Sequence, residues 1–303
     1  MECKDNQILI SPLPTIRASF ERSGEAMRVA FVIPLLIAAA SQAQQPSAQP
    51  GMAPNDLVRK VVANEIKADN QDQSHWMYQV VTNVPAPGKT QAVIETKNGN
   101  ITYLEDINGH PLTPQQRTRE DQRVQQFVTD PDQQSKARRA GDDDDKKSAQ
   151  MFAMLPDAFV FQYAQTHGDI VRLTFHPNPN FTSHSSEAYV FHKMDGFVIV
   201  DTRENRLVEI SGVLSHGVEF LGGLFGHLDP GGTFDVRRQE IAPGHWAITA
   251  LKVNMNGKAL FFKSIAVQQD EVLSHFQRIP DSTTLPQAEA MALKQPARSP
   301  ASE

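Results

Sequence analysis

The sequence predicts an α+β protein organised around one large, curved antiparallel β-sheet. The stretch from Phe197 to Arg278 consists almost entirely of strand-like runs joined by short turns. None of these turns has room for a crossover helix, so each strand is expected to pair antiparallel with its neighbour. Several runs, such as HWAITALKVNM, are apolar on both faces, because side chains alternate across a strand. A second layer is therefore expected over the sheet: helices of the same chain, a bound apolar ligand, or both.

The composition is that of a soluble globular protein. The chain has 303 residues, 40% of them apolar, and a formal net charge of −6. Its 29 basic residues are outnumbered by 35 acidic ones and are dispersed along the chain. Binding to nucleic acid needs a basic surface that neutralises phosphates, so the composition argues against a nucleic-acid partner.

The N-terminal residues 1–43 are predicted to be an upstream extension followed by a secretory signal peptide. Met27 and Arg28 precede an apolar run, and small residues follow it up to Ala43, after which cleavage is expected. The run is about a dozen residues long, too short for the ~20 residues of a transmembrane helix. The alternative is a buried N-terminal helix. Cys3 is the only cysteine, so the exported part is expected to have neither a disulfide nor a lipid anchor.

The predicted globular domain spans residues 54–285 and follows a flexible leader at 44–53. Its first element is a helix over 56–68, for which Asn55 is a plausible N-cap. A three-stranded meander follows, with turns at Asn98-Gly99 and at Asn108-Gly109. Three strands are too few to be stable alone, so this meander is expected to join the later sheet.

A polar helical segment, at about 113–155, is inserted between the two groups of strands. Thr113, Pro114 and Gln116 form a helix-start signal with a capping box. Two or three helices are expected, broken near Pro131 and Gly141, mostly solvated and with an apolar last turn. Such helices are typical of a lid or arm with a wet outer face.

The second half is predicted to be a hairpin over 159–175, a short helix from Ser185 to near Gly196, and the long meander. Asn256-Gly257 lies between two apolar runs and predicts a type I′ hairpin turn there. Residues 286–303 are expected to form a short helix and a disordered tail. The strand-like runs of the meander are FVIVD, RLVEISGVLSHGVEF, TFDVRRQEI, HWAITALKVNM, KALFFKSIAV and EVLSHFQRI.

No catalytic motif stands out, and we predict neither catalytic residues nor a cofactor nor a metal. The nucleophile-elbow, phosphate-loop and zinc-protease signatures do not occur in the sequence. His176, His184 and His192 are equally spaced, but no carboxylate accompanies them at a fixed spacing, so we do not interpret them as a metal site. His216, His227 and His245 are expected at strand ends or turns, where a solvated imidazole is ordinary. A hydrolase that uses a histidine and a carboxylate remains an open alternative.

The Gly-rich segment 221–228 carries Leu224 and Phe225 between two strands. Apolar side chains on a glycine-rich loop suit a gate or a contact with lipid. The alternative is a wide turn whose Phe225 packs into the core.

In the order of its elements, and in runs such as MDGFVIVDTRENRLVEISGVL and GKALFFKSI, the chain resembles the periplasmic outer-membrane lipoprotein-sorting (LolA/LolB-like) superfamily. The resemblance covers about residues 55–279. It implies a periplasmic half-open β-barrel of about 11 strands with an apolar concave face under a helical lid. It also implies that the ligand is an acyl chain or a lipoprotein.

Sequence and resemblance together predict a non-enzymatic binding and transfer protein with peripheral contact to the membrane. An empty apolar hollow of ~400 Å³ would cost on the order of 10 kcal/mol, so an occupant is expected. The alternative is an envelope interaction or sensor module that binds protein, with its lid packed inside. The residues expected to form the apolar cavity and its gate are Trp76, Tyr78, Phe159, Phe161, Leu224, Phe225, Trp246, Phe261 and Phe276.

Overall fold

The computed structural model describes residues 51–294 except 184, 186, 221–225 and 260–262. The predicted signal peptide therefore lies outside the described residues, together with Leu224, Phe225 and Phe261. The helices are α1 (Pro54–Gln71), α2 (Pro114–Thr129), α3 (Pro131–Ala158), the 3₁₀ helix η1 (Glu187–Lys193) and α4 (Leu285–Lys294).

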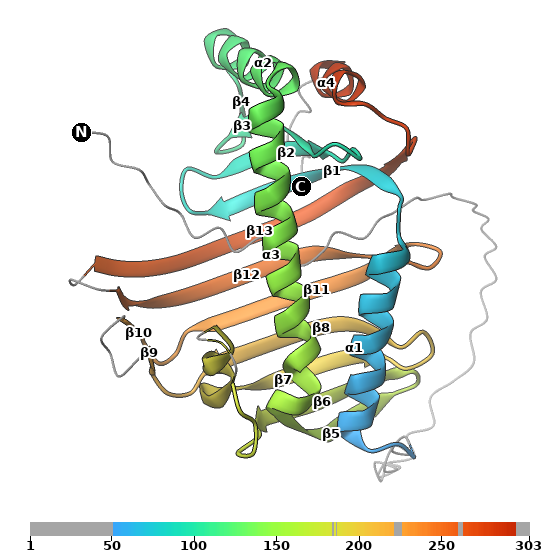
Figure 1. The fold of residues 1–303 in the computed structure, drawn as a ribbon, viewed down its shortest axis with the longest axis vertical. Helices are drawn as coiled ribbons and strands as arrows, with labels where there is room; N and C mark the ends of the chain where they lie inside the picture. The colour runs from blue at the N-terminus through green and yellow to red at the C-terminus, as the bar shows by residue number, and fades with distance from the viewer. Residues whose placement is uncertain (1–50, 184, 186, 221–225, 260–262, 295–303) are drawn as a thin grey trace, which may run out of the picture.

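The described strands form a single antiparallel sheet that confirms the predicted α+β class. They follow the order β4-β3-β2-β1-β13-β12-β11-β8-β7-β6-β5, with the pair β9 and β10 attached beside β12. The order starts at β4 and ends at β5, so the curved sheet is not closed (Figure 1). The strands are β1 (His75–Val84), β2 (Lys89–Ile94), β3 (Ile101–Ile107), β4 (His110–Pro111), β5 (Phe159–His167), β6 (Ile170–Pro177), β7 (Met194–Asp201), β8 (Arg206–Leu214), β9 (Val218–Phe220), β10 (Gly226–Leu228), β11 (Thr233–Ala242), β12 (His245–Ala259) and β13 (Lys263–Ile279).

The N-terminal meander joins the later sheet, as expected from its small size. β1 pairs with β13 from His75 opposite Ile279 to Val84 opposite Asp270. The turn between β3 and β4 has positive φ at Asn108 (55°) and Gly109 (73°), as a type I′ turn requires. The last strand of the chain thus holds the first strands in place.

The predicted turn at Asn256-Gly257 is wrong. β12 continues through both residues, which pair with Ala266 and Ile265 of β13. A Cβ atom at Gly257 would lie 2.1 Å from the His227 carbonyl oxygen, so this glycine permits the close approach of β10 rather than a turn. β13 runs as one strand from Lys263 to Ile279, where the sequence suggested separate strands for KALFFKSIAV and EVLSHFQRI.

Helices cover both faces of the sheet, in different places. Figure 1 shows α1 and α3 side by side across one face, where α1 packs through Leu57, Val58, Val61 and Val62. On β2, Val93 belongs to this core, whereas Ala92 and Ile94 point to the opposite face, because side chains alternate along a strand. There α2 and α4 cover them, through residues that include Val124, Leu285 and Ala288.

The inserted segment forms two helices, and the break at Pro131 is confirmed. Thr113 and Gln116 make the predicted capping box at the start of α2. The expected break at Gly141 is wrong, since α3 runs unbroken for 28 residues. A glycine inside a helix costs only about 1 kcal/mol relative to alanine, which a long helix tolerates. The buried residues of α3 are all in its last turn: Leu155, Pro156 and Ala158.

Asn55 does not cap α1, contrary to expectation. The helix begins at Pro54, its N-cap is Ala53, and no side chain accepts the cap hydrogen bond. The Asn55 amide instead donates to the carbonyls of Pro156 (2.9 Å) and Phe159 (2.7 Å), and its Oδ1 accepts from the Phe161 amide (3.0 Å). These bonds fix the start of α1 at the junction of α3 and β5.

Candidate functional site

Four of the predicted ligand-binding residues lie in the main core under α1 and α3. Trp76, Tyr78, Phe159 and Phe161 are each at most 7% exposed. The Phe159 ring packs against the rings of Phe175 (4.5 Å between centroids) and Phe191 (5.3 Å). These side chains form a continuous packed core and do not line the cavity described below.

The other two described residues lie nearby. Phe276 is partly buried and stacks on Tyr78 with 5.2 Å between the ring centroids. Trp246 is 6% exposed and donates from Nε1 to a carboxylate oxygen of Glu204 at 3.1 Å. The guanidinium of Arg206 lies 5.8 Å from the Trp246 ring centroid. Trp246 therefore borders a buried group of charges that the sequence analysis did not single out.

The centre of this group is Glu65, which is fully buried on the inner face of α1. Its Oε2 lies 2.7 Å from Arg238 Nη1 and 3.3 Å from Arg206 Nη2, and both arginines are about nineteen-twentieths buried. Its Oε1 accepts a hydrogen bond of 2.7 Å from the Leu207 amide. One carboxylate thus ties α1 to β8 and to β11.

The two arginines keep unused hydrogen-bonding capacity. Among the described residues, the Nε of Arg206 and the Nε of Arg238 have no hydrogen-bond partner, although both atoms are shielded from solvent. A buried donor without a partner costs about 1–3 kcal/mol, more if it is charged. Burial lowers the pKa of Arg206, while the nearby charge of Glu65 raises it.

Asp69 lies one helical turn beyond Glu65, in the last turn of α1. Its Oδ1 is shielded from solvent and has no hydrogen-bond partner among the described residues. Burial raises the pKa of Asp69 to about 7, and the positive charge of Arg238 opposes this rise. The place of Asp69 in the last turn of α1 also favours a raised pKa, because the carbonyl end of a helix disfavours a negative charge. This carboxyl group therefore changes its protonation near neutral pH.

A partly enclosed cavity of about 310 Å³ adjoins these charges, between α1, α3 and the strands β8 and β11. Its wall is mixed in character, with apolar side chains beside two cationic and two acidic ones. Burial raises the pKa of Asp145, and the neighbouring charge of Asp142 raises it further. The lining residues are Ile66, Asp69, Asn70, Asp145, Lys146, Ala149, Phe152, Leu207 and Arg238.

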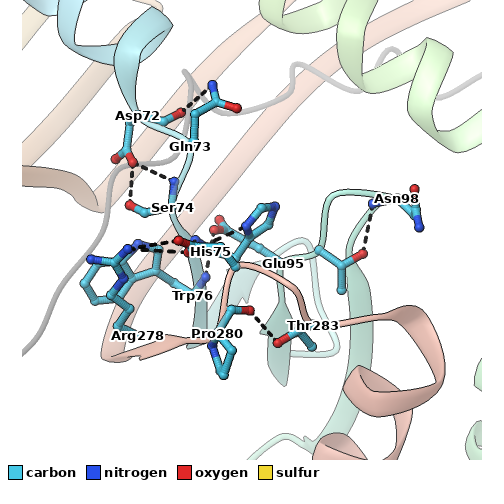
Figure 2. A network of polar contacts seen from close by, with 12 residues as sticks. Asp72, Gln73, Ser74, His75, Trp76, Glu95, Asn98, Arg278, Pro280 and Thr283 are labelled. Atoms are coloured by element: carbon cyan, nitrogen blue, oxygen red, sulfur yellow. Dashed lines mark hydrogen bonds and ion pairs between the residues drawn. The ribbon is translucent and has the colours of Figure 1, made fainter.

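A second polar network lies beyond the end of α1, where the chain enters β1 (Figure 2). The carboxylate of Asp72 accepts from the Ser74 amide (2.9 Å) and from the Ser74 hydroxyl. His245 Nδ1 lies 3.4 Å from the other oxygen of Asp72. Ser74 and His245 thus both contact the carboxylate of Asp72. In a catalytic triad the histidine lies between the aspartate and the serine, so this arrangement is not a triad.

The same network joins β1 to β2 and to the end of β13. The Trp76 amide donates to Glu95 Oε2 at 3.1 Å, and Arg278 lies 3.2 Å from Asp281 (Figure 2). A cavity of about 400 Å³ adjoins it, with Arg206 and His245 in its wall. Arg206 thus contacts Glu65 and also lines this second cavity, and the network itself fixes the end of α1 to the sheet.

Two kinds of feature are absent from the part of the chain that the structure describes. No group of three histidine, cysteine, aspartate or glutamate side chains there could hold a metal ion. No helix there is long and apolar enough to cross a membrane.

The sequence did carry a signal for the buried charges. Val61, Glu65 and Asp69 follow one another at four-residue spacing, so both acids continue the apolar stripe of α1. A charged side chain on the buried face of a helix is unusual unless it is paired. The arginines carried no comparable signal, because basic residues are common on strands that have one wet face.

The comparisons with known proteins leave the family open. No family model, no curated protein and no solved structure matches this chain. The resemblance to the lipoprotein-sorting superfamily therefore stays a prediction.

Proposed function

We propose that this chain is a non-enzymatic binding and transfer protein for acyl chains or lipoproteins, exported to the periplasm and acting at the cell envelope. The observation that carries the proposal is the cavity of about 310 Å³ between α1, α3 and the sheet. Ile66, Ala149, Phe152 and Leu207 supply apolar wall there. Cavities that hold small molecules combine such walls with a few polar groups.

The size of the cavity limits which ligands fit without a movement of α3. Ligand cavities usually measure ~300–1,000 Å³, so this one is at the small end of the range. It suits a short amphiphile or the end of a longer chain. A long acyl chain requires α3 to move away from the sheet, and burying ~12 methylenes returns about 10 kcal/mol before the cost of binding.

The contacts of α3 favour such a movement. Its buried residues belong to the last turn, whereas Met151, Phe152 and Met154 are only partly buried. Arg59 and Asp157, which join α1 to α3 at 2.8 Å, are both more than half exposed. Exposed ion pairs contribute little, typically 0–1 kcal/mol. The part of α3 before Met151 therefore moves at a lower cost than its last two turns, which pack against the core.

Mass spectrometry of lipid co-purified with the protein from its own envelope tests the proposal directly. A bound acyl compound supports it, and a lipid-free protein with no affinity for fluorescent fatty acids contradicts it. Phe152→Ala is expected to weaken fatty-acid binding several-fold, because it removes apolar wall. Phe197→Ala is the matched control, since this partly buried phenylalanine lies on the opposite face of the sheet, under Arg172.

A second function is favoured by the packing of the aromatic core. Phe159 and Phe161, expected in an apolar cavity, are instead packed among other rings. A sheet whose inner face is filled by its own side chains suits an interaction or sensor module that binds protein. A cross-linked protein partner that persists after delipidation, on a chain that takes up no lipid, is the outcome that selects this alternative.

A further inference from the structure

The charges around the cavity do not balance when Asp69 is protonated. Arg206 and Arg238 carry two positive charges, and Glu65 carries one negative charge between them. In the cavity wall, Lys146 and Asp145 of α3 offset each other. Within this set of groups, one positive charge is left over in a place that is largely closed to water.

The other acidic groups nearby, Glu204 and Asp72, do not line the cavity. Glu204, beyond Arg206, shares Arg203 with Asp201, at 3.1 and 4.0 Å. Asp72, at the end of α1, lies 3.4 Å from His245. The charged groups that face Asp69 come from every element packed around it: Glu65 of α1, Asp72 at the C-cap of α1, Arg206 of β8, Arg238 of β11, and Asp145 and Lys146 of α3.

Two unused hydrogen-bonding groups belong to side chains in the cavity wall. Arg238 is 6% exposed, and its Nε–H has no acceptor among the described residues. Oδ1 of Asp69 likewise has no partner there. A guanidinium and a protonated carboxyl group are both donors. Both side chains line the same cavity, so an acceptor with one negative charge suits the donors that they offer.

We infer that the cavity binds the carboxylate head of a fatty acid, which accepts hydrogen bonds from Arg238 and from the protonated carboxyl group of Asp69. The apolar side chains Ile66, Ala149, Phe152 and Leu207 receive the first methylenes of the chain. A carboxylate carries the one negative charge that neutralises the excess, whereas a phosphate dianion carries more. The inference rests on the proposed function and narrows its ligand class.

This geometry makes binding dependent on pH. The pKa of Asp69 is about 7, so its carboxyl group is a donor below neutral pH and a repelling charge above it. The carboxyl group of a fatty acid, like that of glutamate, is already ionised at pH 6. Affinity for the carboxylate therefore falls about tenfold between pH 6 and pH 8.

Calorimetric titration of the purified full chain with octanoate, octanol and octyl phosphate tests the inference. At pH 6 octanoate is expected to bind at least about tenfold more tightly than octanol, because a charge-assisted hydrogen bond is lost with the neutral head. Octanol bound as tightly as octanoate overturns the inference and leaves the proposed function standing. If neither compound binds, the proposed function fails together with it. Tighter binding of octyl phosphate overturns the choice of a carboxylate.

Substitutions at Arg238 and at Asp69 test the contribution of each donor to octanoate binding separately. Arg238→Gln is expected to weaken octanoate about tenfold and to leave octanol unchanged, whereas Arg237→Gln changes neither. Arg237 is the matched control because it precedes Arg238 on β11, is 59% exposed and pairs with Asp235 at 3.1 Å. Asp69→Asn keeps the affinity for octanoate and loses its dependence on pH. An unchanged tenfold fall in that variant overturns the role of Asp69. The comparison of octanoate with octanol and octyl phosphate uses the parent chain, so it tests the inference even if Arg238→Gln fails to fold.

Discussion

Glu65 compensates two buried guanidinium groups and has no exposure of its own. Glu65→Gln keeps the shape and the acceptor for the Leu207 amide, but it leaves two buried positive charges without a counter-charge. Breaking a buried ion pair by removing one partner costs about 3–5 kcal/mol. The urea midpoint is therefore expected to fall strongly.

The control for Glu65→Gln is Asp157→Asn, which breaks an exposed pair with Arg59. It is expected to cost less than about 1 kcal/mol. Equal midpoints for the two variants would mean that Glu65 is not essential to the packing of α1 on the sheet.

The pKa of Asp69 predicts how stability changes with pH. The folded chain holds this proton up to about pH 7, whereas in the unfolded chain the carboxyl group returns to its ordinary pKa of 3.8. The folded state thus binds more protons between these values, so stability declines as pH rises from about 4 to 7. The contribution is up to about 4 kcal/mol.

Asp69→Asn removes this dependence, because asparagine does not titrate. The variant is expected to match the parent chain near pH 4 and to melt at a higher temperature at pH 8. Thermal unfolding at both pH values measures the difference between the two chains. A difference that stays the same at pH 4 and pH 8 contradicts the raised pKa.

The sequence predicts the hydrogen-bond partners of a side chain when they lie within a few residues, but not when they lie far along the chain. The capping box of Thr113 is correct because its partners lie within three residues of it. Asn55 was misassigned because its partners, Pro156, Phe159 and Phe161, lie about a hundred residues further along the chain. Local spacing contains no information about such contacts.

At the element scale, two glycines with opposite roles provide a test. Gly257→Ala places a Cβ atom 2.1 Å from the His227 carbonyl oxygen, so β10 must separate from β12. A destabilisation of several kcal/mol is expected. Gly141→Ala meets no atom within 4 Å inside α3 and is expected to stabilise the chain by about 0.5–1 kcal/mol.

Denaturant unfolding of both glycine variants measures these effects. If Gly257→Ala is tolerated as well as Gly141→Ala, then the close approach of β10 is not a requirement of the fold. The pair also explains the error at Asn256-Gly257. The sequence shows a glycine between apolar runs, but it does not show whether the glycine serves a turn or a close contact.

At the scale of the whole molecule, the sheet was predictable and the site was not. Most of the strand order follows from short connections, because neighbours in sequence pair with one another, whereas β1 pairs with β13 and β8 with β11. The buried charges come from α1, β8 and β11, and Glu65 and Arg238 are far apart in the sequence. Only the packing of α1 across the sheet brings them together. The sequence therefore indicated a covering layer without showing that charges lie under it.

The packing of α3 predicts which part of the molecule opens first. Elements with few buried side chains exchange their amide hydrogens through local opening, and long strands in the middle of a sheet do so only by larger unfolding. Residues 132–150 of α3 are therefore expected to exchange faster than β11 and the described part of β12. Octanoate at pH 6 is expected to slow exchange in α3, because Lys146, Ala149 and Phe152 line the cavity. Hydrogen exchange followed by mass spectrometry measures both effects in the full chain, with α2 as the internal control. If the amides of α3 are as well protected as those of β11 without ligand, the helix is a fixed layer and the access route to the cavity must lie elsewhere.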